Sequence, residues 1–108
     1  MRTRVKLGST TVGDTGAVAL VGTITNEVWE VSYILTCRTT GASGTVIGQG
    51  HFEFDNSTNS GLFEGMPATG TTTIDTTASQ AVSVTVEWGT ADAANTISCT
   101  NLILEVLN

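Results

Sequence analysis

Alternation of apolar and polar residues is the feature that most constrains what this chain can fold into. In residues 27–39, every odd position from Trp29 to Cys37 is apolar and most even positions are polar. Successive side chains of a β-strand point to opposite faces, so this pattern predicts a strand with one face in a core and the other in water. The 3.6-residue period of an amphipathic helix is hard to find anywhere in the chain. We therefore expect an all-β fold.

Two further segments alternate in the same way. Residues 81–88 place three valines and Trp88 on one face. Residues 46–55 place Phe52 and Phe54 on one face. Weaker alternation predicts additional strands over residues 4–7, 17–25, 61–64 and 71–75. With a last strand near the C-terminus, about eight short strands follow one another, which is typical of an antiparallel β-sandwich or barrel.

Three large aromatic residues, Trp29, Tyr33 and Trp88, fall on the apolar faces of these strands. Packing in the core is the better interpretation of this placement, and a platform on which a sugar stacks is the alternative. Gly48 and Gly50 lie on the inward face of segment 46–55. Their missing side chains leave room for a large neighbour, for which we expect Trp29 or Trp88.

The composition of the chain excludes several classes of protein. With 108 residues and neither a linker nor an internal repeat, the chain is expected to form a single domain over residues 1–108. Only 13% of the residues are charged, whereas disordered chains are rich in charge. The net charge of −6 argues against nucleic acid as a partner. The chain contains no run of about 18 apolar residues, so the sequence predicts no membrane-spanning helix.

Three of the four basic residues stand in the first six positions: Arg2, Arg4 and Lys6. Two interpretations are open for residues 1–8. They form a basic arm that docks onto an acidic surface of a partner, or they are a solvated, frayed terminus. No apolar core of a signal peptide follows them, so the chain is expected to be cytoplasmic when made, or to be a piece of a longer protein.

The two cysteines, Cys37 and Cys99, lie far apart and show neither a CxxC pattern nor metal-ligand spacing. Cysteines in strand cores are usually small buried hydrophobic residues. Because nothing indicates secretion, we expect two free, buried thiols, and a single disulfide is the alternative.

The last segment, residues 95–108, departs from the alternation. Its end is apolar on both faces, at Leu102, Ile103, Leu104, Val106 and Leu107. A strand buried on both sides belongs at the centre of a parallel sheet, but this chain has no crossover helices. We therefore expect these five residues to form a subunit interface, with the outer face covered by another copy of the chain. A bulge near residue 100 that shifts the register once is the alternative, and the two can coexist.

Candidates for catalysis or metal binding are few. His51 is the only histidine, and on a strand it shares one face with Glu53 and Asp55. Side chains two residues apart on a strand stand parallel, about 7 Å apart, and do not converge on a metal. A solvated polar face is thus the better interpretation. No motif of an activated nucleophile is present, so we expect neither an enzyme nor a cofactor.

Two loop-like stretches are further candidates for sites of interaction. Residues 55–59 are rich in oxygen ligands but lack the residue order of a calcium loop, which favours a turn capped by its own side chains. Phe63 lies in an apolar stretch between turn-forming residues, and we expect it on an edge strand or in a subunit contact.

The C-terminal half contains a recognisable succession of motifs. Residues 75–80 read D-T-T-A-S-Q, an alternating strand then ends at Trp88, and residues 91–97 fit the pattern A-x-x-A-N-T-I. Together with the apolar ending at residues 100–107, this stretch resembles C-terminal segments in structural proteins of tailed bacteriophages. The resemblance implies a small jelly roll, similar to trimeric TNF-like folds. Such domains serve in head decoration (cement), in head fibres and at tail-fibre tips.

A role follows from this resemblance as an expectation. It implies a non-enzymatic virion structural protein that is assembled in the bacterial host cytoplasm. The expected partners are further copies of the chain in a homotrimer, and the major capsid protein or other virion proteins. In that role, residues 102–107 join the subunits and the loops or the basic N-terminal residues grip the shell. The alternative is a tail-fibre tip domain that binds a receptor or a carbohydrate.

Overall fold

The computed structural model describes residues 1–20, 25–55 and 61–107, and all regular secondary structure in these ranges is β-strand. Seven strands are formed there. They are β1 (Arg2–Leu7), β2 (Thr10–Asp14), β3 (Trp29–Thr39), β4 (Gly44–Asp55), β5 (Gly61–Met66), β6 (Thr72–Ile74) and β7 (Val82–Glu87). The expectation of an all-β fold is therefore confirmed.

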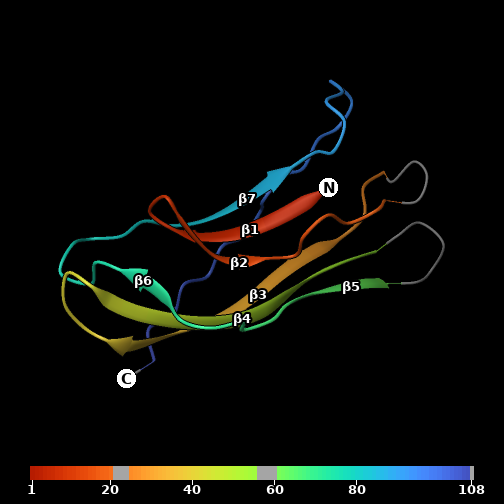
Figure 1. The fold of residues 1–108 in the computed structure, drawn as a ribbon. Helices are drawn as coiled ribbons and strands as arrows, with labels where there is room; N and C mark the ends of the chain where they lie inside the picture. Colours follow the sequence, from red (N-terminus) through yellow and green to blue (C-terminus); the bar gives the residue numbers. More distant parts are fainter. Residues whose placement is uncertain (21–24, 56–60, 108) are drawn as a thin grey trace.

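The strands form two antiparallel sheets that lie face to face (Figure 1). The first sheet has the order β2-β1-β7. The second has the order β3-β4-β5, and β6 pairs with the start of β4. This arrangement is a β-sandwich, in agreement with the spacing of the strands along the sequence.

Inward-facing residues of both sheets form the core. The larger cluster of buried side chains consists of Val5, Val18, Phe52, Phe54 and Met66. A smaller cluster consists of Leu7, Val46 and Ile74. The rings of Phe52 and Phe54 stack with their centroids 5.2 Å apart. The face of β4 that the alternation predicted to be buried is thus the buried one.

Tyr33 occupies the space that the glycines of β4 leave open. A Cβ atom at Gly48 would lie 2.5 Å from Cε1 of Tyr33, and one at Gly50 would lie 2.7 Å from Cδ2. The expected large neighbour therefore exists, but it is Tyr33 and not Trp29 or Trp88. The cross-strand register explains the difference, because Tyr33 pairs directly with Gly50.

Residues 1–8 are neither a free arm nor a frayed terminus. They contain β1, the central strand of the first sheet, which pairs with β2 on one side and with β7 on the other. The inward side chains of β1 are Thr3, Val5 and Leu7, all of which are buried. The basic residues alternate with them and face outward. The three basic residues are thus the outward-facing residues of a strand whose other residues are buried.

Two further expectations differ from the structure. Residues 17–20 and 25 form no strand, although Val18 is buried and exchanges two hydrogen bonds with Met1. Strand β2 includes Gly13 and Asp14, although glycine and aspartate are residues that favour turns. The rest of the expected strand, residues 21–24, and residues 56–59 of the expected turn lie outside the described residues.

The C-terminal segment, defined here as residues 95–107, does not form the expected last strand. It leaves the end of the sandwich beyond β7 and runs as an irregular chain toward the end at which β3 finishes (Figure 1). A strand exists only when a neighbour supplies hydrogen-bond partners. Within the described part of the chain, no strand supplies them to this segment.

The molecule is more open than its length requires. The chain measures 46 × 25 × 25 Å and has a radius of gyration of 15.3 Å, whereas a compact chain of this length has about 13 Å. It exposes 7365 Å² of surface. A compact monomer of 11.2 kDa exposes about 5,700 Å². The excess is therefore about 1,700 Å².

Candidate functional site

The exposed end of the C-terminal segment is the strongest candidate for a functional surface. All five of its large apolar side chains are exposed, with exposed fractions between 69% and 79%. These side chains are Leu102, Ile103, Leu104, Val106 and Leu107. A cluster of this kind is rare on monomeric proteins and marks a contact surface. The structure thus leaves the expected interface residues free to contact a partner.

The backbone of the same segment is also free. Among the described residues, 96–107 form no backbone–backbone hydrogen bond. The last described link to the body of the molecule comes from Trp29, whose Nε1 donates a hydrogen bond of 3.2 Å to the carbonyl of Ser98. Beyond Ser98, apart from the Asn101 carbonyl that accepts a hydrogen bond from Cys99 Sγ, the described backbone presents unused donors and acceptors together with apolar side chains.

The expected bulge near residue 100 has no place in this structure. A bulge is an extra residue within a paired strand, and residues 95–107 are not paired. Burial on both faces by this chain alone is not observed either. Coverage by another copy, the first of the two interpretations, remains a proposal.

The three basic residues of β1 lie on the outer face of the first sheet, and two of them are already in ion pairs. Arg2 Nη2 lies 2.6 Å from Asp14 Oδ2, and Arg4 Nη1 lies 2.7 Å from Glu87 Oε2. A hydrogen bond from Arg2 holds the pKa of Asp14 below its usual value, and one from Arg4 does the same for the pKa of Glu87. A docking partner must compete with these carboxylates. Lys6 is in no salt bridge to a described residue.

His51, Glu53 and Asp55 lie on β4 and alternate with the buried phenylalanines, as the sequence predicted. His51 stacks against Phe63 of β5 with ring centroids 4.8 Å apart. In residues 1–20, 25–55 and 61–107, no group of three or more His, Cys, Asp or Glu side chains could hold a metal ion. No helix among these residues is long and apolar enough to cross a membrane.

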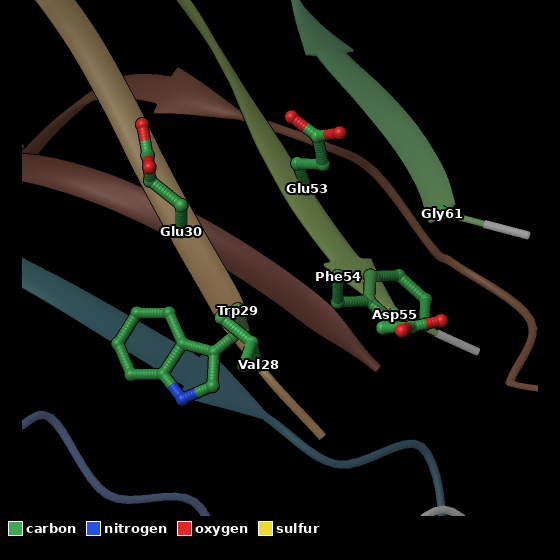
Figure 2. Close-up of a pocket in the computed structure, with 7 residues that line it drawn as sticks. All are labelled: Val28, Trp29, Glu30, Glu53, Phe54, Asp55 and Gly61. Atoms are coloured by element: carbon green, nitrogen blue, oxygen red, sulfur yellow. The ribbon is translucent and has the colours of Figure 1, made fainter. Parts of the chain in front are cut away.

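An open groove of about 400 Å³ lies where β3 begins and β4 ends (Figure 2). Its lining residues are Val28, Trp29, Glu30, Glu53, Phe54, Asp55 and Gly61. Glu30 and Glu53 pair directly across the two strands and project on the same side, away from Trp29 (Figure 2). Like charges placed opposite each other destabilise a sheet. The groove carries no basic side chain in its lining to offset them.

The aromatic residues of the apolar faces serve mainly in packing. Trp29 and Tyr33 pack against the larger core cluster, and the indole of Trp29 lies 6.3 Å from the ring of Phe52. Trp88 is half-buried and lines a depression of about 630 Å³ beside the C-terminal segment. Among the aromatic residues of the chain, Phe63 is the most exposed, with 63% of its surface accessible.

The two cysteines are free, as expected, but they are exposed instead of buried. Cys37 lies near the end of β3, in a stretch from Ile34 to Thr39 in which every residue is exposed. Cys99 lies in the unpaired C-terminal segment. The residues around each cysteine in the sequence are typical of a strand in a core. Among the described residues of this chain, however, no second layer packs over either cysteine.

A comparison of the chain with protein-family models, curated proteins and solved structures finds no match. The features of the chain that bear on its function are therefore the exposed C-terminal segment, the unpaired edges of the sheets and the resemblance in the sequence.

Proposed function

We propose that this chain is a non-enzymatic structural protein that works by associating with copies of itself, as a homotrimer of jelly-roll subunits. The observation that carries the proposal is the excess of about 1,700 Å² of exposed surface over that of a compact monomer. The exposed apolar side chains of residues 102–107 are part of this excess. Association would remove them from water.

The size of the excess favours a trimer. A standard protein interface buries about 800 Å² on each partner. Each subunit of a cyclic trimer takes part in two interfaces, which together bury about 1,600 Å² per subunit. A dimer with one standard interface would leave half of the excess exposed. The excess of about 1,700 Å² thus fits two interfaces for each chain.

Burial of these residues would contribute substantially to holding subunits together. Full burial of a leucine, isoleucine or valine side chain contributes about 1.5–3 kcal/mol. Five such side chains would contribute on the order of 10 kcal/mol before the costs of association are subtracted. The isolated chain, in which eight of the described apolar residues are buried, would gain stability from the same contacts.

We further propose that the protein belongs to a bacteriophage virion, as a capsid decoration (cement) or head-fibre subunit assembled in the host cytoplasm. The support is the resemblance of residues 71–97 and 100–107 to the ends of tailed-phage structural proteins. In this role the major capsid protein or another virion protein is the second partner. Lys6 and the outer face of β1 are the surface that we propose for it.

Purified particles test the assignment to a virion. Virions of the phage that encodes the chain are separated on a density gradient, and the chain is quantified in each fraction by mass spectrometry. The proposal expects it to co-sediment with filled capsids in a fixed ratio to the major capsid protein. Its absence from particles, with abundance only in the soluble fraction of the infected cell, would overturn the assignment.

The second candidate is a receptor-binding or carbohydrate-binding tip domain of a tail fibre. One observation favours it, the exposed ring of Phe63 stacked on His51 and paired across the strands with Glu53. Aromatic faces beside polar groups are typical of sugar-binding surfaces. A glycan array separates the candidates, because a tip domain binds glycans and loses binding in Phe63→Ala, whereas a decoration subunit binds none.

A further inference from the structure

The second sheet ends in an open edge at β3. Among the described strands, β3 pairs only with β4, so the donors and acceptors of its other side have no described strand to bind. Its second half, residues 34–39, is exposed throughout, with exposed fractions of 62% for Ile34 and 36% for Leu35. Open edges of this kind are templates for another strand.

We propose that residues 102–107 of one copy add as a strand to this half of β3 in a second copy. The inference rests on the proposed self-association and names the surfaces that carry it. Both segments consist of six residues that are exposed throughout. Each lacks backbone partners on the side that the other would occupy. An added strand satisfies both sets of backbone groups at once.

The apolar side chains of the two segments would lie on the same face of the extended sheet. Trp29, Val31 and Tyr33 of β3 pack on the core, so alternation also turns Leu35 and Cys37 toward the inner face. That end of the inner face is exposed in the single chain. The added strand would extend this face with three apolar side chains: Leu102, Leu104 and Val106.

The opposite side of the added strand would carry Ile103, Glu105 and Leu107. On the outer face they would meet Ile34 and, at the irregularity of β3 between Cys37 and Thr39, the charge of Arg38. Arg38 is the only basic residue outside β1, and it forms no salt bridge to a described residue. Glu105 forms none to a described residue either. The two segments thus have complementary charges as well as apolar faces.

We assign the added strand to a second copy because residues 102–107 do not cover β3 of their own chain. Ser98 is held at the start of β3 by the indole of Trp29, yet the residues beyond it remain exposed and unpaired in the described structure. The surface excess of the single chain is also of the size that two intermolecular contacts would bury. Repetition of this contact around a threefold axis closes a trimer.

Disulfide scanning in the full chain tests the inference. In a Cys99→Ser background, the native Cys37 is paired in turn with Leu102→Cys, Leu104→Cys or Val106→Cys, and the protein is mildly oxidised. Differently tagged copies are co-expressed, so that a cross-link between chains is distinguished from one within a chain. Ile103→Cys is the matched control, because its side chain would point to the other face.

The inference expects covalent oligomers from at least one of the three inward positions, at least fivefold more than from Ile103→Cys, and none when Cys37 is also replaced by serine. A trimer that yields no cross-link to Cys37 overturns the strand addition and leaves the proposed association intact. Cross-links within single chains also overturn it. A protein that is monomeric before oxidation overturns the inference together with the proposed association.

Reversal of the charges of Glu105 and Arg38 gives a second test of the inference, which does not depend on oxidation. Glu105→Arg is expected to weaken association about two- to fivefold, the range for an exposed ion pair. Arg38→Glu in the same chain is expected to restore it. If the double variant associates no better than the single variants, the two charges do not meet and the proposed pairing is contradicted.

Discussion

The hydroxyl of Tyr33, on β3, donates a hydrogen bond to the carbonyl of Val12, on β2, and so joins the two sheets of the sandwich. The register between β1 and β2 passes from Val5–Gly13 to Lys6–Thr11, which leaves Val12 in a bulge. A carbonyl in a bulge is released from the ladder and needs another partner. Tyr33 supplies that partner from the opposite sheet, and the surrounding burial raises the pKa of its hydroxyl.

Replacement of Gly48 by alanine tests the packing of this tyrosine. The new Cβ would lie 2.5 Å from Cε1 of Tyr33, so Gly48→Ala is expected to lower the free energy of unfolding by about 1–3 kcal/mol. Gly65→Ala is the matched control, because its Cβ would meet nothing nearer than Phe63 Cε1 at 4.0 Å. Urea unfolding measures both variants. Equal effects of the two substitutions would contradict the packing described.

Thr3 carries a buried hydroxyl that has no hydrogen-bond partner among the described residues. Removal of a buried, unsatisfied polar group avoids its desolvation cost. Thr3→Val is therefore expected to raise the free energy of unfolding by about 1–2 kcal/mol. Thr3→Ser, which keeps the hydroxyl and loses a methyl group, is expected to lower it by about 1 kcal/mol. A destabilised valine variant would show that the hydroxyl has a partner.

The pair of Arg2 and Asp14 predicts a pH dependence of stability. The pKa of Asp14 is lowered in the folded chain, chiefly by the hydrogen bond from Arg2, so its contribution is present above the unfolded pKa of about 3.9. The contribution is lost as the pH falls through the folded pKa. We expect wild type to be more stable than Asp14→Asn at pH 7 and the difference to shrink as the pH falls below about 4. A difference that does not change with pH would contradict this account.

The sequence predicted the strands whose alternation is set by contacts within the chain. In β4, Phe52 and Phe54 point into the core as expected, because burial of their rings dominates the choice of face. β1 was the harder case. Weak alternation predicted a strand over residues 4–7, which lies within β1, but the basic residues of the same stretch suggested an arm.

The sequence singled out the residues of the candidate surface, but it did not predict their backbone conformation. The five apolar residues of the C-terminal segment indicated a covered strand, and in the single chain they are exposed coil. A strand needs a pairing partner, and the alternation of one chain does not say which molecule provides it. The exposure of Cys37 has the same origin, since its strand extends past the layer that would cover it.

Leu104→Asp tests the role of the C-terminal segment. Leu104 is 69% exposed in the chain, so an aspartate there is expected to leave the urea midpoint of the isolated fold nearly unchanged. In an interface the same aspartate would be a buried, unpaired charge, and association is expected to weaken about 100-fold or more. Ser79→Asp, at an exposed position outside the strands, is the control and should not affect association. A Leu104→Asp variant that associates like wild type would refute the role of this segment.

The molar mass in solution tests the central claim most directly. Light scattering coupled to size-exclusion chromatography, over a range of protein concentrations, gives the mass of the particle without a shape assumption. The account predicts three times the chain mass of 11.2 kDa for the wild type. A mass of one chain at every concentration, or of two, would contradict the proposed trimer.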